Sequence, residues 1–258
     1  MSSPRRAAVL REMGLAPVWR LRARADAPAR TSEDVSAASS VEAASRVAAP
    51  PSADASLPSE RAARIGRMGW DELGNAVAAC TSCGLCRTRT NTVFGVGART
   101  ATWMIVGEAP GAEEDARGEP FVGQAGRLLD NMLAAIGRSR AADVYIANVL
   151  KCRPPGNRNP EAMEVAQCSP YLLRQIELVQ PRLLLAMGRF AAQTLLGTDA
   201  SIASLRGRLH RYHGVPCVVT YHPAYLLRNL PDKAKAWEDL CFARQVSREL
   251  ESNAAAPS

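Results

Sequence analysis

Four cysteines in two separated stretches of the chain have types and spacing suited to holding a metal. Cys80 and Cys83 form a Cys-x2-Cys pair, and Cys152 and Cys168 follow much later in the chain. Four such thiolates can enclose a tetrahedral zinc ion or a [4Fe–4S] cluster, and the spacing does not separate the two. Cys86 extends the first pair by one more Cys-x2-Cys step. Chance clustering of free thiols is the simpler alternative, which three cysteines so close together disfavour.

A second set of residues suits the recognition of a polar ring. Asn148 lies in an apolar run, where its amide either satisfies backbone groups or reads a base edge with its paired donor and acceptor. His222 ends an apolar stretch; a lone histidine is more often structural, but the end of a strand favours a function. Phe121 is most simply a core aromatic. The 107–111 loop is Gly-rich but is not a phosphate-binding P-loop, because no Gly-Lys-Ser/Thr follows it.

Alternating strand and helix patterns must position these residues. The alternation predicts an α/β fold, a three-layer αβα sandwich with a central, mainly parallel four-stranded sheet. Because ligands of such sheets bind beyond the carboxyl ends of the strands, we expect the chemistry in the loops after them. The expected strands are 103–106, 144–150, 182–187 and a hairpin of 209–212 with 215–221, and the expected helices are 128–136, 160–180, 189–196 and 231–251.

Composition divides the chain into four predicted parts. Residues 1–30 form a basic arm with seven Arg against two acidic residues, which is five of the seven net positive charges. Residues 31–61 are rich in Ala, Ser and Pro and are predicted to be a disordered linker. Residues 62–252 form the globular domain, and 253–258 a disordered tail. The charge argument for nucleic-acid binding by the domain itself is therefore weak.

The chain shows neither a secretory signal nor an apolar run long enough to span a membrane. Seven cysteines, an odd number, argue against a disulfide framework. We expect a cytoplasmic monomer of the bacterial cytosol or nucleoid. An Arg-rich, acid-poor N-terminus is also typical of an organelle transit peptide, which stays open as an alternative.

From about residue 76 to residue 250, the ordered motifs together resemble the family 4 uracil-DNA glycosylases, the iron–sulfur branch of that superfamily. No single motif decides the resemblance, but the ordered set is specific. The matching stretches are Cys80-Thr-Ser-Cys83, Val93-Phe-Gly-Val-Gly97, Gly107-Glu-Ala-Pro-Gly111 with Glu114-Asp115, Pro120-Phe-Val-Gly123, Gly126-Arg-Leu-Leu-Asp130, Asn148-Val-Leu-Lys-Cys-Arg-Pro-Pro155, Asn157-Arg-Asn-Pro160 and His222-Pro-Ala-Tyr-Leu-Leu-Arg228.

The resemblance implies a structural [4Fe–4S] cluster and a pocket for uracil flipped out of DNA. Cys86 falls outside the family's pattern, and whether it replaces Cys80 or Cys83 stays open. The implied cluster ligands are Cys80, Cys83, Cys152 and Cys168, and the implied pocket residues are Gly107, Glu108, Ala109, Glu114, Phe121, Asn148 and His222.

Roles within this pocket follow from the chemistry of uracil excision. Asn148 would accept from uracil N3–H and donate to O4, while His222 would donate to O2 as charge develops on the leaving base. Ala109 stands where the family 1 enzymes have an Asp that orients water, so Glu108 is expected to take that role, with Glu114 as a second candidate. The loop from Cys152 to Pro160 has no His, which predicts turnover without a covalent adduct.

The segment after His222 is expected to meet single- or double-stranded DNA. Tyr225, Leu226 or Leu227 would wedge into the base stack, and Arg228 and Arg206 would contact phosphate. The simpler alternative places both leucines in the core. Two other functions stay open: a non-catalytic nucleic-acid-binding module whose fold the metal stabilises, and a zinc protein of unknown activity.

Overall fold

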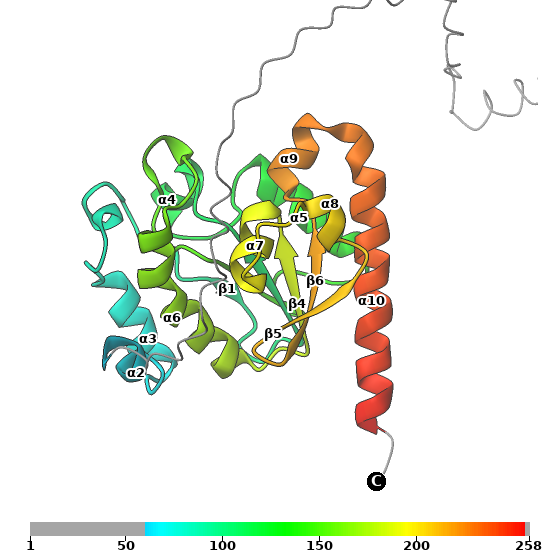
Figure 1. The fold of residues 1–258 in the computed structure, drawn as a ribbon, viewed down its shortest axis with the longest axis horizontal. Helices are drawn as coiled ribbons and strands as arrows, with labels where there is room; N and C mark the ends of the chain where they lie inside the picture. The colour runs from blue at the N-terminus through cyan, green and yellow to red at the C-terminus, as the bar shows by residue number, and fades with distance from the viewer. Residues whose placement is uncertain (1–59, 256–258) are drawn as a thin grey trace, which may run out of the picture. The chain divides into compact units, whose positions relative to one another are not determined.

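A computed structural model describes residues 60–255 and their side chains up to residue 253 (Figure 1). The predicted basic arm, nearly all of the predicted linker and most of the tail lie outside the described residues. The first helix among the described residues begins at Glu60, two residues before the predicted start of the domain. The helices are α2 (Glu60–Ile65), α3 (Trp70–Ala78), α4 (Ala112–Arg117), α5 (Gln124–Ala135), α6 (Ala162–Val179), α7 (Arg189–Leu196), α8 (Ile202–Leu205), α9 (Pro223–Arg228) and α10 (Lys233–Ala255), with 3-10 turns at Gly84–Arg87, Pro155–Asn157 and Leu230–Asp232.

The described strands form one six-stranded sheet in the order β1-β3-β2-β4-β6-β5. Its strands are β1 (Val96–Gly97), β2 (Trp103–Gly107), β3 (Val144–Asn148), β4 (Leu183–Met187), β5 (Leu209–Tyr212) and β6 (Val215–Thr220). The four central strands β3, β2, β4 and β6 are parallel, as predicted. Two antiparallel edge strands widen the sheet: β5 forms the predicted hairpin with β6, and β1 pairs with β3. Strand β1 was not predicted, because its two residues are too few to show an alternating pattern.

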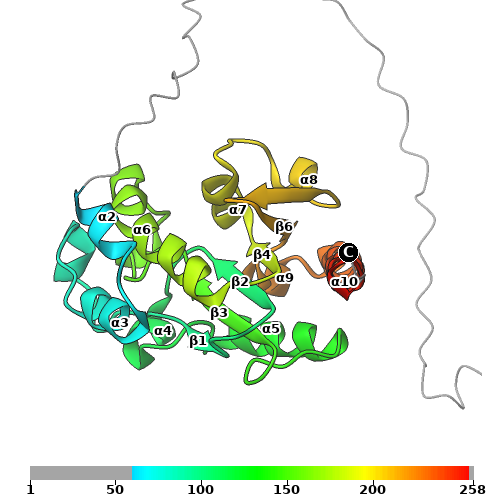
Figure 2. The same cartoon turned by 90° about the horizontal axis from the view of Figure 1, so that it is seen from below.

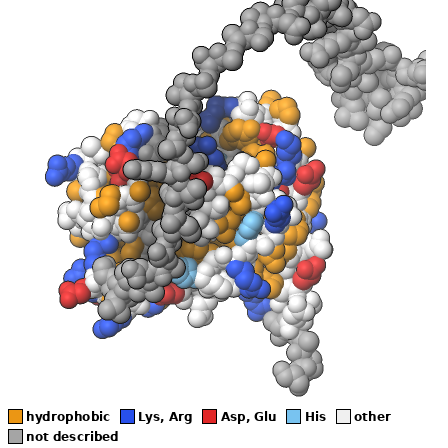
Figure 3. Space-filling view, viewed as in Figure 1, with side chains coloured by type: hydrophobic (Ala, Val, Ile, Leu, Met, Phe, Trp, Pro, Cys, Tyr) orange, Lys and Arg blue, Asp and Glu red, His pale blue; other side chains and the backbone are white. Residues whose placement is uncertain are grey.

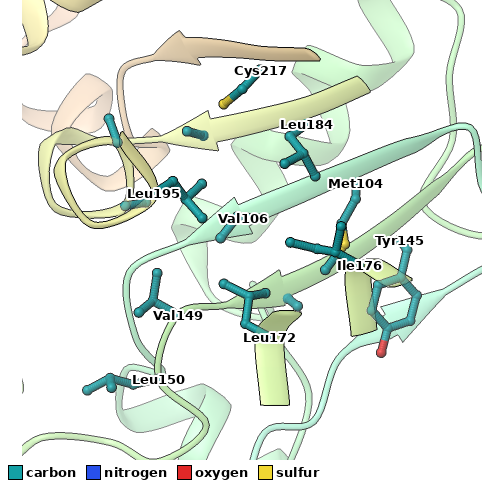
Figure 4. Packing of buried hydrophobic residues seen from close by; sticks show 14 of the residues in the cluster. Met104, Val106, Tyr145, Val149, Leu150, Leu172, Ile176, Leu184, Leu195 and Cys217 are labelled. Carbon is teal, nitrogen blue, oxygen red and sulfur yellow. The ribbon is translucent and has the colours of Figure 1, made fainter. Parts of the chain in front are cut away.

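Helices cover both faces of the sheet, which confirms the αβα layers. Figure 2 shows α6 and α7 on one side of the strands and α5 and α10 on the other. Alternate residues of each central strand point to opposite faces, so Met104 and Val106 of β2 pack with α6 and α7, while Trp103 and Ile105 pack with α5 and α10. Figure 4 shows the first of these cores, with Leu172 and Ile176 of α6 against the sheet.

Three helix starts differ from the predicted ones: α5 begins at Gln124, four residues before the predicted start, and the other two differ for local reasons. Helix α6 begins at Ala162, because the Glu164 carboxylate accepts the backbone N–H of Glu161, 2.8 Å away, and so caps the helix there. Helix α10 begins at Lys233, because Pro231 belongs to the preceding 3-10 turn. Among the described residues, no helix is long and apolar enough to cross a membrane.

Candidate active site and cysteine pocket

The parallel topology gathers the predicted polar residues at one edge of the sheet. Glu108 follows β2, Asn148 ends β3, Arg189 follows β4 and His222 follows β6. A cleft of about 740 Å³ opens above these strand ends. Its lining includes Glu108, Ala109, Glu114, Phe121, Asn148, Asn157, Arg158, Arg189, Tyr221, His222, Tyr225 and Arg228. The carboxyl-end location expected from the fold class is therefore where the cleft lies.

Asn148 presents an unused amide to this cleft. Its side chain is 2% exposed, yet no described residue forms a hydrogen bond with its carboxamide. A nearly buried amide that lacks protein partners has its donor and acceptor available for a ligand. Gly107 pairs with Asn148 across β2 and β3 and allows this arrangement, because a Cβ there would collide with Asn148 Oδ1 and lie 2.8 Å from the Phe121 ring.

Phe121 occupies a strained position beside Asn148. Its φ of 56° is unusual for a bulky residue, and such strain persists only where the surroundings hold it. Arg140 supplies that hold: its guanidinium donates to the carbonyls of Pro120 and Phe121, each at 2.8 Å. Gly126 lets α5 approach the Phe121 carbonyl, where a Cβ would collide. The ring stacks on His222 with 5.3 Å between centroids and is positioned to cover a flat ligand.

His222 is held as a neutral hydrogen-bond donor. Its Nδ1 accepts the backbone N–H of Ala224 at 3.1 Å, so the proton of the neutral ring sits on Nε2. Burial lowers the pKa of His222 to about 4, with Arg228 acting in the same direction and Glu114 against it. Gly188, at φ 94°, leaves room for the ring, because a Cβ there would lie 2.9 Å from His222 Cβ.

The two candidate carboxylates have different surroundings. Glu108 lines the cleft, and burial raises its pKa, although the charge of Arg189 opposes the rise. Glu114 also lines the cleft, but it accepts backbone N–H groups from Gly111 at 3.2 Å, Val122 at 3.0 Å and Gly123 at 3.3 Å. Glu114 therefore holds the loop that carries Phe121, whereas no described residue donates a hydrogen bond to the Glu108 carboxylate.

Helix α9 separates the predicted DNA-contacting residues. Tyr225 and Arg228 line the cleft, and Leu227 is 40% exposed. Tyr225 is also fixed within the fold, since its hydroxyl donates to Asp232 at 2.6 Å. Leu226 is 1% exposed and packs in the core, so its prediction as a DNA contact is wrong. The helical turn explains the difference, because adjacent residues point in directions about 100° apart.

Arg206 is a second correction. Its Nε donates to the buried Asp239 at 2.9 Å, and its guanidinium lies 5.3 Å from the centre of the Tyr221 ring. The same guanidinium also donates to the Lys235 carbonyl. Arg206 therefore anchors α10 to the sheet and is not available to phosphate.

On the face shown in Figure 3, Lys and Arg side chains are scattered among Asp and Glu side chains.

The predicted cysteine ligands line one common pocket. Cys80, Cys83, Cys152 and Cys168 all contribute to it, and so does Cys86. Protein donors face the sulfurs: Arg89 Nη1 lies 3.1 Å from Cys152 Sγ, and the Lys151 backbone N–H lies 3.3 Å from Cys168 Sγ. These donors favour the thiolate, the form that binds metal, although burial outweighs them and raises the pKa of the Cys152 and Cys168 thiols.

The donors in this pocket indicate which metal groups it could hold. Among the described side chains, no three His, Cys, Asp or Glu form a group suited to a single metal ion. Cysteine thiols that line one pocket are a donor set that suits either a tetrahedral zinc ion or a [4Fe–4S] cluster. The remaining cysteines, Cys217 and Cys241, do not line this pocket.

Three site residues were missed by sequence reasoning. Arg189 and Arg140 gave no local signal, because each acts across the sheet or loop through tertiary contact. Lys151 did offer one: a lysine in an apolar run, directly before Cys152, indicates a buried charge. It is 1% exposed.

Comparison with known proteins agrees with this geometry. Residues 94–241 match the model of the uracil DNA glycosylase superfamily. The chain is similar to a type-4 uracil-DNA glycosylase of Archaeoglobus fulgidus, with 45% identity over 61% of this chain and 82% of that protein. Type-4 uracil-DNA glycosylases of Saccharolobus solfataricus (40% identity; 70% and 87% covered) and Thermotoga maritima (46%; 59% and 80%) are also similar. The chain belongs to the uracil DNA glycosylase superfamily, in its type-4 branch.

Proposed function

We propose that this protein removes uracil from DNA by hydrolysing the bond between the base and deoxyribose, which releases free uracil and leaves an abasic site. The observation that carries the proposal is the cleft in which the strained Phe121, the unpartnered Asn148 amide and the neutral His222 converge. A non-catalytic nucleic-acid binder has no need of these three groups together.

The base is read by its hydrogen-bonding edge. Asn148 accepts from uracil N3–H and donates to O4, and Phe121 stacks on the ring. Cytosine presents the reverse pattern at these atoms, so it leaves buried groups unpaired, at a cost of roughly 1–3 kcal/mol per group. The close contact of Gly107 with both side chains leaves them little freedom to adapt to another base.

Bond cleavage places negative charge on the departing uracil and positive charge on the sugar. His222 donates its Nε2 proton in a hydrogen bond to uracil O2, which is oxyanion-type stabilisation worth roughly 3–4 kcal/mol per donor. The neutral ring suits this role because it keeps a fixed donor without adding charge. Glu108, as carboxylate, positions the water that attacks the anomeric carbon and offsets the charge of the sugar.

The thiols of Cys80, Cys83, Cys152 and Cys168 would hold a [4Fe–4S] cluster, whose contribution is to tie the 80–86 and 151–168 segments together beside the cleft. Cys86 is left without a ligand role. We further propose that the enzyme acts as a monomer on single- or double-stranded DNA in the bacterial cytosol or nucleoid, with Leu227 and Arg228 meeting the DNA beside the flipped base.

The test is incubation of the purified protein with a uracil-containing oligonucleotide, followed by alkaline cleavage of abasic sites. We expect strand breaks at uracil and none in the matched cytosine oligonucleotide. His222→Gln should abolish most turnover but keep DNA binding, whereas His210→Gln, on the edge strand β5, should behave as the unaltered protein does. DNA binding without any cleavage would instead support the non-catalytic module. Stoichiometric zinc without iron and acid-labile sulfide would refute the cluster.

A further inference from the structure

Lys151 lies between the cysteine pocket and the cleft, and its contacts reach both. Its backbone N–H donates to Cys168 Sγ at 3.3 Å, and the residue is part of the lining of the cysteine pocket. Its ammonium donates to the backbone carbonyl of Asn148 at 2.8 Å and to Gln175 Oε1 at 2.6 Å. One residue thus contacts a sulfur on one side and the base-reading residue on the other.

The burial of this charge calls for a reason. Lys151 is 1% exposed, and none of the ion pairs among the described side chains includes it. Burial lowers the pKa of Lys151, and the sulfurs of Cys168 and Cys152 are the groups that oppose this. An apolar residue of the same length would avoid the cost of burying an ammonium, so the charge is expected to have a role besides filling space.

Asn148 is held at its backbone while its side chain stays free. The Val149 N–H donates to the Gly107 carbonyl at 2.9 Å, which fixes the strand end from one side. Lys151 fixes the Asn148 carbonyl from the other. Gln175 completes the support from α6, because its Nε2 donates to the Phe94 carbonyl at 2.9 Å and to the Tyr145 hydroxyl at 3.2 Å.

We propose that Lys151 is a positioning residue, which couples the orientation of the Asn148 carboxamide to the cysteine pocket. The proposal rests on the proposed function, since it assigns how the base-reading group is held. Without the ammonium, the Asn148 carbonyl loses its buried partner and the strand end is free to shift. A displacement of about 1 Å at such a group is enough to lower the rate by on the order of 100-fold.

The test compares the cluster-loaded protein with its Lys151→Met variant, which keeps the stem and removes the ammonium. Single-turnover rate and KM are measured on a uracil oligonucleotide, and binding of free uracil by calorimetry. We expect the rate to fall roughly 10- to 100-fold and uracil binding to weaken with it, while KM for DNA changes little. Tyr145→Phe, which removes only the hydroxyl beyond Gln175, should leave all three unchanged.

A spectroscopic readout separates positioning from general support. If Lys151 links the sites, free uracil should alter the visible circular dichroism of the cluster in the unaltered protein and in Tyr145→Phe, but not in Lys151→Met, because coupling between two sites is reciprocal. Iron content is measured alongside, and rates are expressed per cluster. A Lys151→Met rate and uracil affinity equal to those of the unaltered protein would overturn the proposal. No cleavage by the unaltered protein would overturn the proposed function instead.

Discussion

The strained backbone of Phe121 makes Arg140 the most informative residue to change. A φ of 56° at a bulky residue costs on the order of 1–3 kcal/mol. Arg140 offsets that cost with two charge-assisted hydrogen bonds at 2.8 Å to the Pro120 and Phe121 carbonyls, each worth roughly 1.5–3 kcal/mol. Its ion pair with Asp130, which is 48% exposed, adds at most about 1 kcal/mol.

Arg140→Met should therefore lower the free energy of unfolding by about 2–4 kcal/mol, because water replaces part of the lost bonding. Released from its clamp, the Phe121 loop relaxes and the stacking on the base weakens. Stacking of this kind is worth roughly 1–3 kcal/mol, which corresponds to about a 5- to 150-fold loss in kcat/KM. Urea unfolding and steady-state cleavage of a uracil oligonucleotide measure the two effects.

Arg138→Met is the matched control. Arg138 has similar exposure, 18% against 21% for Arg140, but it lies over the Trp103 ring at 4.4 Å and does not line the cleft. It should lose stability while its kcat/KM stays within about twofold of the unaltered protein. If Arg140→Met kept full kcat/KM, or if both variants lost it equally, the link from Arg140 to the Phe121 ring would be refuted.

Three further predictions concern the same cleft. Burial lowers the pKa of His222 to about 4, so His222 should not cause kcat/KM to fall as the pH drops past about 6.5, the ordinary pKa of histidine. A fall of kcat/KM near about pH 6.5 that is absent from His222→Gln would contradict this. Gly107→Ala should lower kcat/KM by about 10-fold or more through overpacking of roughly 1–3 kcal/mol against Asn148 and Phe121, with little loss of DNA affinity in a gel-shift assay; an unchanged kcat/KM would show that the pocket adapts. Leu226→Asn should destabilise the fold by about 2–5 kcal/mol, while Leu227→Asn should leave unfolding unchanged and weaken DNA binding; equal melting temperatures would contradict the assignment.

The central part of the fold could be read from the sequence because its signals are local. Short apolar runs at 103–106, 144–150 and 182–187 predicted parallel strands, and the ends of those strands predicted where the chemistry lies. The order of the strands and the short edge strand β1 depend on pairing between distant segments, which no local pattern records.

The ends of the helices and the exposure of individual side chains were harder to predict from the sequence. The start of α6 depends on the Glu164 carboxylate, which caps the helix at Glu161, two residues past what the local pattern predicted. Leu226 and Leu227 are identical in type and adjacent, so only the orientation of α9 against the core decides which is buried. Arg206 was predicted to contact phosphate because its partner Asp239 is distant in the sequence, and only the fold brings the two side chains together.

By itself, the sequence determined the family, and it predicted the residue types of the proposed base-reading pocket and the proposed cysteine ligands, because these are carried by ordered motifs of fixed spacing. Only the tertiary structure decided what holds those residues: Arg140 behind Phe121, Glu114 under the loop, and Lys151 between Asn148 and Cys168. The physical reason is that aim and protonation depend on burial and on partners brought together by folding. A motif indicates which residue types are present, and the packing around each side chain determines its orientation and its protonation state.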